Sequence, residues 1–508
     1  MNKNLLFSFL LIAFIGCKKA ETPIIEISEV ELNEDAGTFA EIGSYAVGGA
    51  GAAEITAFDP LSNRLFVVNN TEGNNRIEVI DFKNPAAMKS IGNIPLANYG
   101  GFVNSLSVHD GKLAAAIEST DKQANGKVVV FKTSDYSEIK VVTVGALPDM
   151  VTFSPDGKYI LSANEGEPND AYTVDPIGTV SIISVANNYA VSTLDFAAFA
   201  SQKAALMTKG FRVFGPGKDF LKDIEPEYIT ISEDSKTAWV TLQENNAIAK
   251  INIDSKTVTD IFPLGFKDYN LDGNEIDPSD KDNVMLLGKW KLKGMYLPDA
   301  IAVLESAGTP YLFTANEGDA REYTGFSELQ RIKDKSIILD PTAFPTASLL
   351  KKDEQLGRLN ITTTLGDTDG DGDYDELYSF GARSFSVWNG NSGAQVYDSK
   401  NELDAKNINA GFYDDNRSDD KGVEPEGITI GSVGAKKLAF IGLERSDALA
   451  IYDVSNPSKP VFLQLLKTGD APEGVLFITA KNSPTKRSLL LVSSEGDGQI
   501  KVYSPKTI

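Results

Sequence analysis

The 508-residue chain is long enough for a large buried core, and its 42% hydrophobic and 23% charged residues are typical of a globular protein. Its 71 acidic and 48 basic residues give a formal net charge of -23, which excludes the basic footprint of nucleic-acid binding, so we expect no nucleic acid as a partner. A single Cys and a single His exclude an internal disulfide framework and the common zinc and non-haem iron sites.

The N-terminal residues have the features of an export signal. Residues 5–15 form an almost purely apolar run after Lys3, too short to span a bilayer, and the run ends in Gly16 and Cys17 as in a bacterial lipobox. We predict a lipoprotein signal peptide over 1–16, a lipid on Cys17 and a flexible tether over 17–36. The membrane would then be a partner through the lipid, and the location would be the bacterial cell envelope, either the periplasm or the outer-membrane surface. The alternative is a simple secretory signal with a chance Cys.

From residue 37 onward, one pattern recurs seven times: an acid, a short apolar strand, a turn, a second apolar strand and a Glu. The third unit shows it clearly, with Asp149 before the first strand, a Pro-Asp-Gly turn at 155–157 and Glu165 after the second strand. Repeats of this length that contain several short strands are typical of propeller blades. We therefore predict an all-β, seven-bladed β-propeller over 37–508, with long insertions in blades three to five.

The last unit ends after three strands, whereas a strand-like stretch at 39–47 precedes the first unit without a blade of its own. We predict that this N-terminal strand completes the last blade and closes the ring, because an open sheet edge is unfavourable. Insertions are expected at about 187–222, 264–292 and 320–420, and segments of this length are usually functional loops or lids. Short helices are predicted around 196–206 and 326–334.

The two acids of each unit are predicted to meet at one end of the propeller, since a hairpin returns to the end where it started. Like charges placed together repel, and hard cations would neutralise them. We predict several calcium ions, or another divalent metal, bound by carboxylates. The predicted ligands are Glu54, Glu72, Glu118, Asp149, Glu165, Glu227, Glu244, Asp299, Glu317, Glu426, Glu444, Glu473 and Glu495, with Asn104 replacing the first acid of unit two. The alternative is that each Glu accepts hydrogen bonds from backbone amides and shapes its loop.

A second metal motif lies in the largest insertion. Acids recur at every other position from 367 to 375, with Gly372 at the sixth position, which is the spacing of an EF-hand-like or thrombospondin-like calcium loop. The predicted ligands are Asp367, Asp369, Asp371, Asp373 and Asp375. Tyr378 stands where an EF-hand has its Glu, and 268–274 is a weaker second copy. A solvated acidic turn is the alternative.

Several arginines interrupt the acidic segments, and a guanidinium group binds phosphate or carboxylate through two parallel hydrogen bonds. Catalytic roles are predicted for Arg321, Arg445 and Glu317, and substrate binding for Arg212, Arg383 and Arg417. The alternative is a set of Arg–carboxylate pairs that hold the loops together.

The segments 225–229, 242–247, 315–323, 366–388 and 417–428 resemble the choice-of-anchor I family, secreted bacterial propellers with relatives labelled mesenchyme-specific cell-surface glycoproteins. The resemblance implies display outside the cytoplasm, and some members carry an alkaline-phosphatase label. The acid-lined face is also similar in architecture to calcium-loaded propeller phosphatases and phytases.

Two functions follow as hypotheses. The first is a metal-dependent phosphoester hydrolase acting on a small phosphorylated substrate. The second is a non-catalytic, calcium-stabilised module that binds a surface ligand. The sequence leaves open whether the protein is an enzyme.

Overall fold

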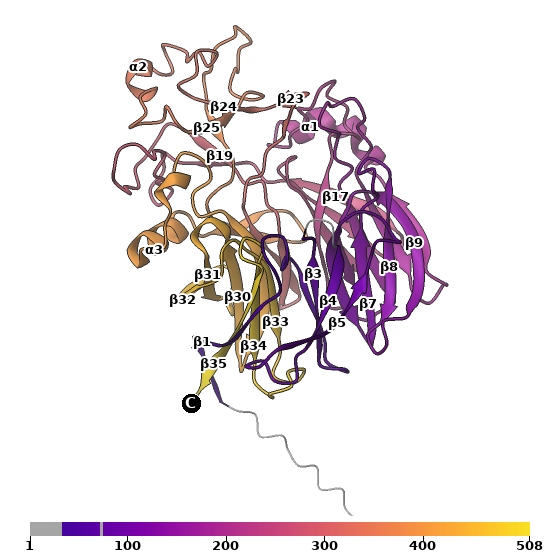
Figure 1. Ribbon diagram of the computed structural model, residues 1–508. Helices are drawn as coiled ribbons and strands as arrows, with labels where there is room; N and C mark the ends of the chain where they lie inside the picture. The colour runs from indigo at the N-terminus through magenta and orange to yellow at the C-terminus, as the bar shows by residue number, and fades with distance from the viewer. Residues whose placement is uncertain (1–32, 72–74) are drawn as a thin grey trace, which may run out of the picture.

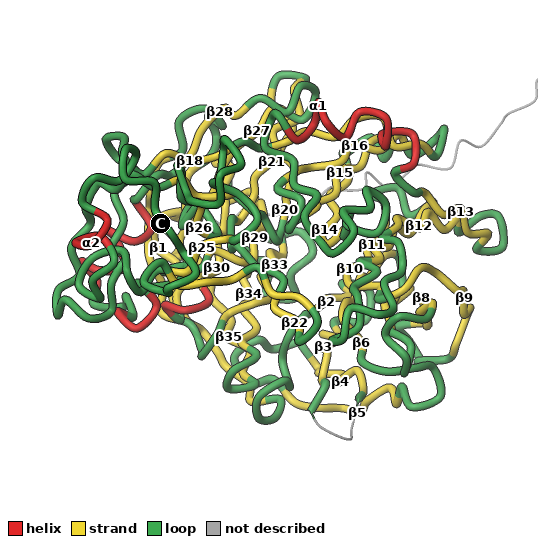
Figure 2. Tube along the Cα trace, turned by 90° about the horizontal axis from the view of Figure 1, so that it is seen from above, coloured by secondary structure: helices red, strands yellow, loops and turns green. Residues whose placement is uncertain are grey.

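The computed structural model describes residues 33–71 and 75–508. Within them the chain forms seven four-stranded antiparallel sheets, which are the blades of a β-propeller (Figure 1). The first strands of consecutive blades contact one another in chain order, and the first strand of blade seven contacts that of blade one. Figure 2 shows these innermost strands arranged around a common centre. The predicted all-β, seven-bladed propeller is therefore confirmed.

The blades follow the chain, with the first strand innermost. Blade one comprises β2 (Thr56–Asp59), β3 (Arg64–Asn69), β4 (Arg76–Asp81) and β5 (Lys89–Pro95). Blade two comprises β6 (Val103–His109), β7 (Lys112–Ile117), β8 (Asn125–Lys132) and β9 (Glu138–Ala146). Blade three comprises β10 (Pro148–Phe153), β11 (Tyr159–Asn164), β12 (Thr179–Ser184) and β13 (Ala190–Leu194). Blade four comprises β14 (Pro226–Ile231), β15 (Thr237–Leu242), β16 (Ala247–Asn252) and β17 (Thr257–Pro263).

The remaining three blades include the one that spans both chain ends. Blade five comprises β20 (Ile301–Ser306), β21 (Thr309–Ala315), β27 (Phe385–Asn389) and β28 (Gln395–Asp398). Blade six comprises β29 (Pro425–Val433), β30 (Lys436–Leu443), β31 (Ala448–Asp453) and β32 (Val461–Lys467). Blade seven comprises β33 (Pro472–Ile478), β34 (Leu489–Ser494), β35 (Gln499–Thr507) and β1 (Glu34–Ala46).

The outermost strand of blade seven comes from the start of the described chain. β1 pairs antiparallel with β35, from Glu34 opposite Thr507 to Ala46 opposite Gln499. Phe39 is 2% exposed and packs edge-on against Phe440 of blade six, so β1 contributes to the core as well as to the sheet. The predicted closing strand at 39–47 is thus confirmed, and it begins five residues earlier than predicted.

Buried apolar runs explain why these segments form strands. The second strand of a blade is covered on both faces, and β34 is buried at all six positions. The turns between the first and second strands of the blades are tight, as at Gly157 between β10 and β11, whose φ is +67°. A Cβ there would lie 2.3 Å from Cδ2 of His109, whose ring also packs on Phe153. The lone His therefore has a packing role between blades two and three.

The insertion elements β19, β24, β25 and α2 lie at the upper left of Figure 1, whereas α1 lies on the right above the blades. Segments from two insertions build a separate five-stranded sheet in the order β18 (Phe266–Asp268), β19 (Lys293–Met295), β26 (Tyr378–Ser379), β25 (Asn360–Thr362) and β24 (Leu329–Arg331). This sheet has its own apolar core, which includes Ile332, Leu356 and Ile361. The short helix α2 (Ala347–Leu350) packs against the core. Within residues 33–71 and 75–508, no helix has the length and hydropathy needed to cross a bilayer.

The insertions differ from the prediction in two ways. The helix predicted at 196–206 is confirmed by η1 (Ala197–Gln202) and α1 (Lys203–Met207). The helix predicted at 326–334 is wrong, because this segment forms β23 (Phe326–Ser327), paired with β22 (Glu322–Tyr323), and then β24. The span 320–420 is also not one insertion, since it contains two strands of blade five and the helix α3 (Glu402–Ala410). β23 forms a hairpin with the neighbouring β22, whereas β24 is decided by its pairing with β25 later in the chain, which local sequence does not record.

Candidate functional site

A β-bulge at the start of the innermost strand turns one polar residue of most blades toward the axis. In blade three the pairing of β10 with β11 skips from Pro148 to Val151, and Asp149 lies within the irregular step. Bulges bend a strand and redirect its side chains. The equivalent residues are Asn104 in blade two, Glu227 in blade four, Glu426 in blade six and Glu473 in blade seven.

A backbone hydrogen bond places the second acid of a blade beside the first. In blades three and seven, the residue before the Pro that begins the innermost strand has a left-handed φ, 47° at Leu147 and 51° at Ala471. The carbonyl of Leu147 accepts the N–H of Glu165 at 2.9 Å, and the carbonyl of Ala471 accepts that of Glu495 at 3.0 Å. Glu118 and Glu444 bond in the same way, to the carbonyls of Phe102 and Glu424. The two acids of a hairpin therefore lie at one end, as the repeat predicted.

Two neighbouring cavities mark the place where the acids meet. The first has a volume of about 60 Å³ and contains Asn104, Asp149, Asp299 and Glu473. It lies on the propeller axis, because its walls come from all seven blades: Ile55, Ser105, Met150, Tyr228, Ala300, Ile428 and Val475. The second, open to solvent, has a volume of about 420 Å³ and shares three of these polar residues. Its other acids are Glu54, Glu118, Glu165 and Glu167. We call this end of the propeller the mouth.

We use the term axial ring for the acids that begin the innermost strands, Glu54, Asp149, Glu227, Asp299, Glu426 and Glu473, together with Asn104. Burial first, and then the nearby Glu495, raises the pKa of Glu54 to about 7. Burial and then Glu167 raise the pKa of Asp149 to about 7. The low dielectric of a buried site disfavours the charged carboxylate, and a neighbouring negative charge adds to the effect.

The other four acids of the ring are perturbed more strongly. Burial, followed by a neighbouring carboxylate, raises the pKa of each well above its usual range. That neighbour is Asp299 for Glu227, Glu317 for Asp299, Glu444 for Glu426 and Glu54 for Glu473. One buried oxygen each of Glu227, Glu426 and Glu473 accepts no hydrogen bond from the described residues. The axial ring is therefore a set of crowded carboxylates that lack counter-charge in the described part of the protein.

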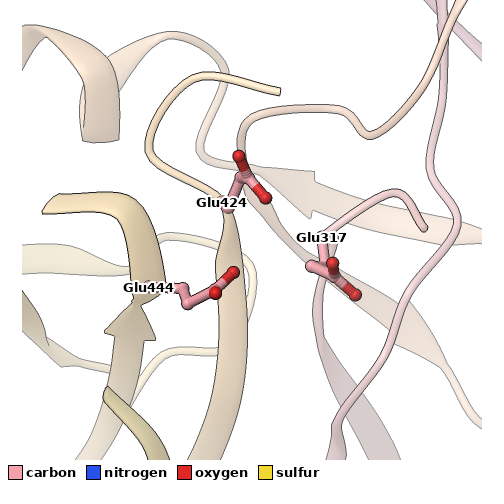
Figure 3. A group of neighbouring side chains, drawn as sticks. All are labelled: Glu317, Glu424 and Glu444. Carbon is pink, nitrogen blue, oxygen red and sulfur yellow. The ribbon is translucent and has the colours of Figure 1, made fainter. Parts of the chain in front are cut away.

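The side of the mouth formed by blades five and six is different, because cationic side chains neutralise it. Glu317, Glu424 and Glu444 each place an oxygen within 4.8 Å of the other two (Figure 3). Lys421 Nζ lies 2.6 Å from Glu317 Oε1, and Arg445 Nη2 lies 2.9 Å from Glu444 Oε1. Burial would raise the pKa of Glu317, but the charge and hydrogen bond of Lys421, the hydrogen bond from Gln243 and the charge of Arg445 together lower it.

At the second position of two blades, a neutral side chain directly follows the strand. In blade one, Asn70 directly follows β3, and its Nδ2 donates to Glu54 Oε2 at 2.8 Å. Glu72, the predicted ligand, lies outside the described residues. In blade four, Gln243 directly follows β15 and donates to Glu317 Oε2 at 2.8 Å. Glu244, the predicted ligand, comes one residue later and lies close enough to Glu165 and Glu227 to help raise the pKa of each.

Further polar residues at the mouth were missed. Glu167, Asp319, Lys421 and Glu424 do not belong to the repeated acid positions, so the repeat gave no signal for them. A signal did exist for Glu424, which precedes Pro425 at the site where other units have Leu147 or Ala471. Glu424 is fully buried between blades five and six, and its Oε1 accepts hydrogen bonds from Arg417.

Three of the predicted substrate-binding or catalytic arginines are buried, and we correct that prediction. Arg321 is 2% exposed, and its Nη1 and Nη2 pair with Asp223 Oδ1 at 2.6 Å and Glu225 Oε1 at 3.0 Å. Arg212 pairs with Glu328, and both guanidinium groups lie over the ring of Phe214. These groups link insertions to one another, as in the Arg–carboxylate alternative, and one donor, Arg212 Nε, is buried without a hydrogen-bond partner among the described residues.

The other three arginines of that prediction differ in exposure. Arg383 is 2% exposed and donates to the carbonyls of Asp277, Ser418 and Asp420, so these donors are used within the protein. Arg417 pairs with Glu424, beside the 3-10 turn η2 (Asp415–Arg417). Arg445, in the 3-10 turn η3 (Glu444–Ser446), keeps 43% of its side chain exposed at the mouth.

The acidic loop of the insertion folds into a compact turn. Asp367, Asp369 and Asp375 place one oxygen each within 4.8 Å of one another, and Asp340, Asp373 and Asp375 form a second such group. Asp371 lies in the same turn, where its Oδ1 accepts the N–H of Asp373. The predicted loop thus brings its acids together, with Asp340 as a member that the spacing did not indicate.

Known proteins resemble the chain at the level of family and fold. The family model of the choice-of-anchor I domain matches residues 54–457, which confirms the resemblance seen in the sequence. The mesenchyme-specific cell surface glycoprotein of Strongylocentrotus purpuratus is 27% identical over 364 residues, which cover 61% of this chain and 46% of that protein. Gigasin-3a of Magallana gigas is 26% identical over 188 residues, 30% of this chain and 66% of that protein. The chain therefore matches less than two thirds of the length of both relatives.

Solved structures give a more distant comparison. Kuenenia stuttgartiensis hydrazine synthase is 12% identical with a TM-score of 0.49, over 91% of this chain and 98% of that one. The β-propeller domain of Myceliophteria thermophila Cps50 (Swd1) is 9% identical with a TM-score of 0.47, over 92% and 100% of the two chains. The fold assignment rests on the strand order and not on these matches.

Proposed function

Because this chain belongs to the choice-of-anchor I family, we propose that it is a surface-displayed propeller that binds divalent cations, calcium above all, at its acidic mouth. The bound cations complete the mouth as a binding site for a surface ligand. The cell-surface name of the sea urchin relative supports display outside the cytoplasm.

The uncompensated carboxylates of the axial ring carry the proposal. Carboxylate oxygens that are buried without hydrogen bonds or counter-ions are costly, and a hard cation would stabilise their charged form. Calcium accepts six to eight oxygen ligands in flexible geometry, including waters and side-chain amides such as Asn104. The ring is not among the groups whose oxygens lie within 4.8 Å of one another, so we expect waters or ligand oxygens to fill part of the coordination sphere.

Lipid anchoring at Cys17 belongs to the same proposal, although Cys17 lies outside the described residues. The chain enters the propeller at Glu34, next to the C-terminal end of β35, whereas the other end of β1 lies near Glu495 and the mouth. An anchor that precedes Glu34 would leave the mouth facing away from the membrane. This orientation suits a site that binds ligands from outside the cell. Mass spectrometry of the membrane-extracted protein tests the lipid on Cys17. The wild type should carry the lipid, and a Cys17→Ala variant should be released from the membrane without it.

Calcium content and affinity test the cation site. The wild-type protein, dialysed against calcium and then analysed by mass spectrometry, should retain calcium that a chelator removes. Glu227→Gln should weaken binding roughly tenfold or more, which corresponds to about 1.4 kcal/mol. Glu233→Gln is the matched control, because Glu233 is exposed at the other end of the same hairpin. A folded wild-type protein without chelatable calcium would refute the proposal.

The acidic loop of the insertion is proposed as a second calcium site. Its support is the pair of oxygen groups around Asp375 and the spacing of the acids. Calcium there would order the five-stranded insertion sheet. Asp375→Asn should lower the calcium content and increase hydrogen exchange in the insertion, and Asp254→Asn, on an exposed turn of blade four, should do neither.

A phosphoester hydrolase remains the second candidate, and two cations at the mouth favour it. Lys122 and Arg445 keep 50% and 43% of their side chains exposed while lying beside Glu118 and Glu444. They could bind the oxygens of a phosphoryl group, and a bound metal would supply Lewis-acid activation of water. Calcium-dependent turnover of a chromogenic phosphomonoester, lost in Arg445→Gln, would support hydrolysis; absence of turnover in calcium-loaded protein would exclude it.

A further inference from the structure

The Lys421 ammonium lies where the acids of blades five and six come closest together. Its Nζ is 2.6 Å from Glu317 Oε1, 3.1 Å from Glu424 Oε2 and 3.8 Å from Asp319 Oδ1. The side chain is 11% exposed, so these contacts are made largely out of water. An ammonium group in this position has carboxylate oxygens on several sides, as a bound metal ion would have.

The surrounding acids have the dimensions of a metal site. Oxygens of Glu317, Glu424 and Glu444 all lie within 4.8 Å of one another (Figure 3). Two oxygens bound to one calcium at 2.3–2.6 Å are separated by at most about 5 Å. These three acids could therefore coordinate a single ion if the ammonium were removed, in competition with Arg417 on Glu424 and Arg445 on Glu444.

The other side of the mouth lacks an equivalent cation. Among the described residues, no Lys or Arg forms an ion pair with Glu54, Asp149 or Glu473, which share the open cavity of about 420 Å³. Lys122, which is half exposed, pairs with Glu118 on the rim at 3.6 Å, and its charge offsets part of the rise in the pKa of Asp149. Lysine and arginine side chains thus neutralise the acids of blades five and six, whereas Glu54, Asp149 and Glu473 have no such ion pair among the described residues.

We propose that Lys421 is a tethered counter-ion that takes the place of a divalent cation among Glu317, Glu424 and Glu444. It keeps divalent cations away from the side of the mouth formed by blades five and six. This restriction of cation binding rests on the proposed function, whereas the role of Lys421 as a counter-ion does not. Lys421 is in this sense the residue that determines how many ions the mouth accepts.

Replacing the ammonium by an uncharged side chain of similar length tests the proposal. Lys421→Met should bind about one further calcium ion per chain, measured by equilibrium dialysis and mass spectrometry. The double variant Lys421→Met/Glu444→Gln removes a ligand and should lose that ion again. Lys436→Met is the matched control, because Lys436 is exposed and pairs with Asp453 at the other end of blade six, and its calcium content should equal that of the wild type.

Thermal unfolding covers the case in which the variant is unstable. Without calcium, Lys421→Met should unfold at a lower temperature than the wild type, because Glu424 loses a counter-ion. Calcium should raise its unfolding temperature by more than it raises that of the wild type. A variant that fails to fold in chelator should then fold when refolded in calcium; failure to do so would overturn the proposal.

The two proposals fail in different ways. If the wild type binds calcium and Lys421→Met binds no more, the counter-ion proposal is wrong and the proposed function stands. If the wild type binds none and Lys421→Met binds one ion, the counter-ion proposal stands and the proposed function is wrong.

Discussion

Calcium binding at the mouth should release protons near neutral pH, since the axial acids hold protons that a cation must displace. The perturbation is a calcium titration of protein freed of metal by a chelator. Glu54 and Asp149, each with a pKa raised to about 7, are then about half protonated at pH 7. Burial, followed by the neighbouring Glu54, raises the pKa of Glu473 well above its usual range.

The structure sets the size of the effect. If these three acids ligate one ion, binding at pH 7 displaces about half a proton from each of the first two, about one together, and any proton that Glu473 still holds adds to this number. Near pH 9 the first two acids are already ionised, and their share of the released protons should fall close to zero. Affinity should rise over the same range, because fewer protons compete with calcium.

Isothermal titration calorimetry in two buffers with different ionisation enthalpies measures the number of protons. The difference between the observed enthalpies, divided by the difference between the buffer enthalpies, gives the protons released per ion. Glu54→Gln should reduce the number of released protons by about half a proton near pH 7, whereas Glu233→Gln should leave it unchanged. Calcium binding with equal enthalpies in both buffers would refute the reasoning.

Three predictions concern stability. In chelator, the unfolding temperature should fall as the pH rises from about 5 to about 8, because Glu54 keeps its proton in the folded protein up to about pH 7 and loses it near pH 4.5 in the unfolded chain; its share is about 3 kcal/mol at most. Calcium should remove most of this pH dependence, and an unfolding temperature that rises with pH in chelator would contradict it. Arg321→Met should cost about 3–5 kcal/mol in urea unfolding, since it leaves Asp223 and Glu225 buried without their partner; a cost within experimental error would show that the pair is not buried as described. Phe39→Ala should cost a similar amount through the cavity left beside blade six, and a variant as stable as the wild type would mean that β1 does not close the ring.

The sequence was enough to predict the ring of blades and the position of its acids, because both follow from a repeated local pattern. A hairpin returns to the end where it starts. An acid before its first strand, such as Asp149, and an acid after its second strand, such as Glu165, therefore lie at the same end. The closing strand was predictable for the same reason, since a blade with three strands needs a fourth. Repetition supplied the information that a single unit would lack.

Contacts between distant segments were not predictable. Arg321 was expected to face a ligand, yet its partners Asp223 and Glu225 come from another insertion about a hundred residues earlier. Lys421 has no counterpart in other units, so nothing in the repeat connects it with Glu317. The pattern of acids also could not determine that Gln243 and not Glu244 directly follows β15, because one residue of strand length is below what periodicity resolves.

The antiparallel pairing of β1 with β35 has a mechanical consequence. If the chain ahead of Glu34 is held on one side and a ligand at the mouth is pulled to the other, the tension acts along the length of β1. The hydrogen bonds between the two strands then share the load together instead of breaking one after another from an end. β1 closes the propeller and also transmits force to it. Single-molecule stretching from the N-terminal side should meet its main resistance at the pairing of β1 with β35.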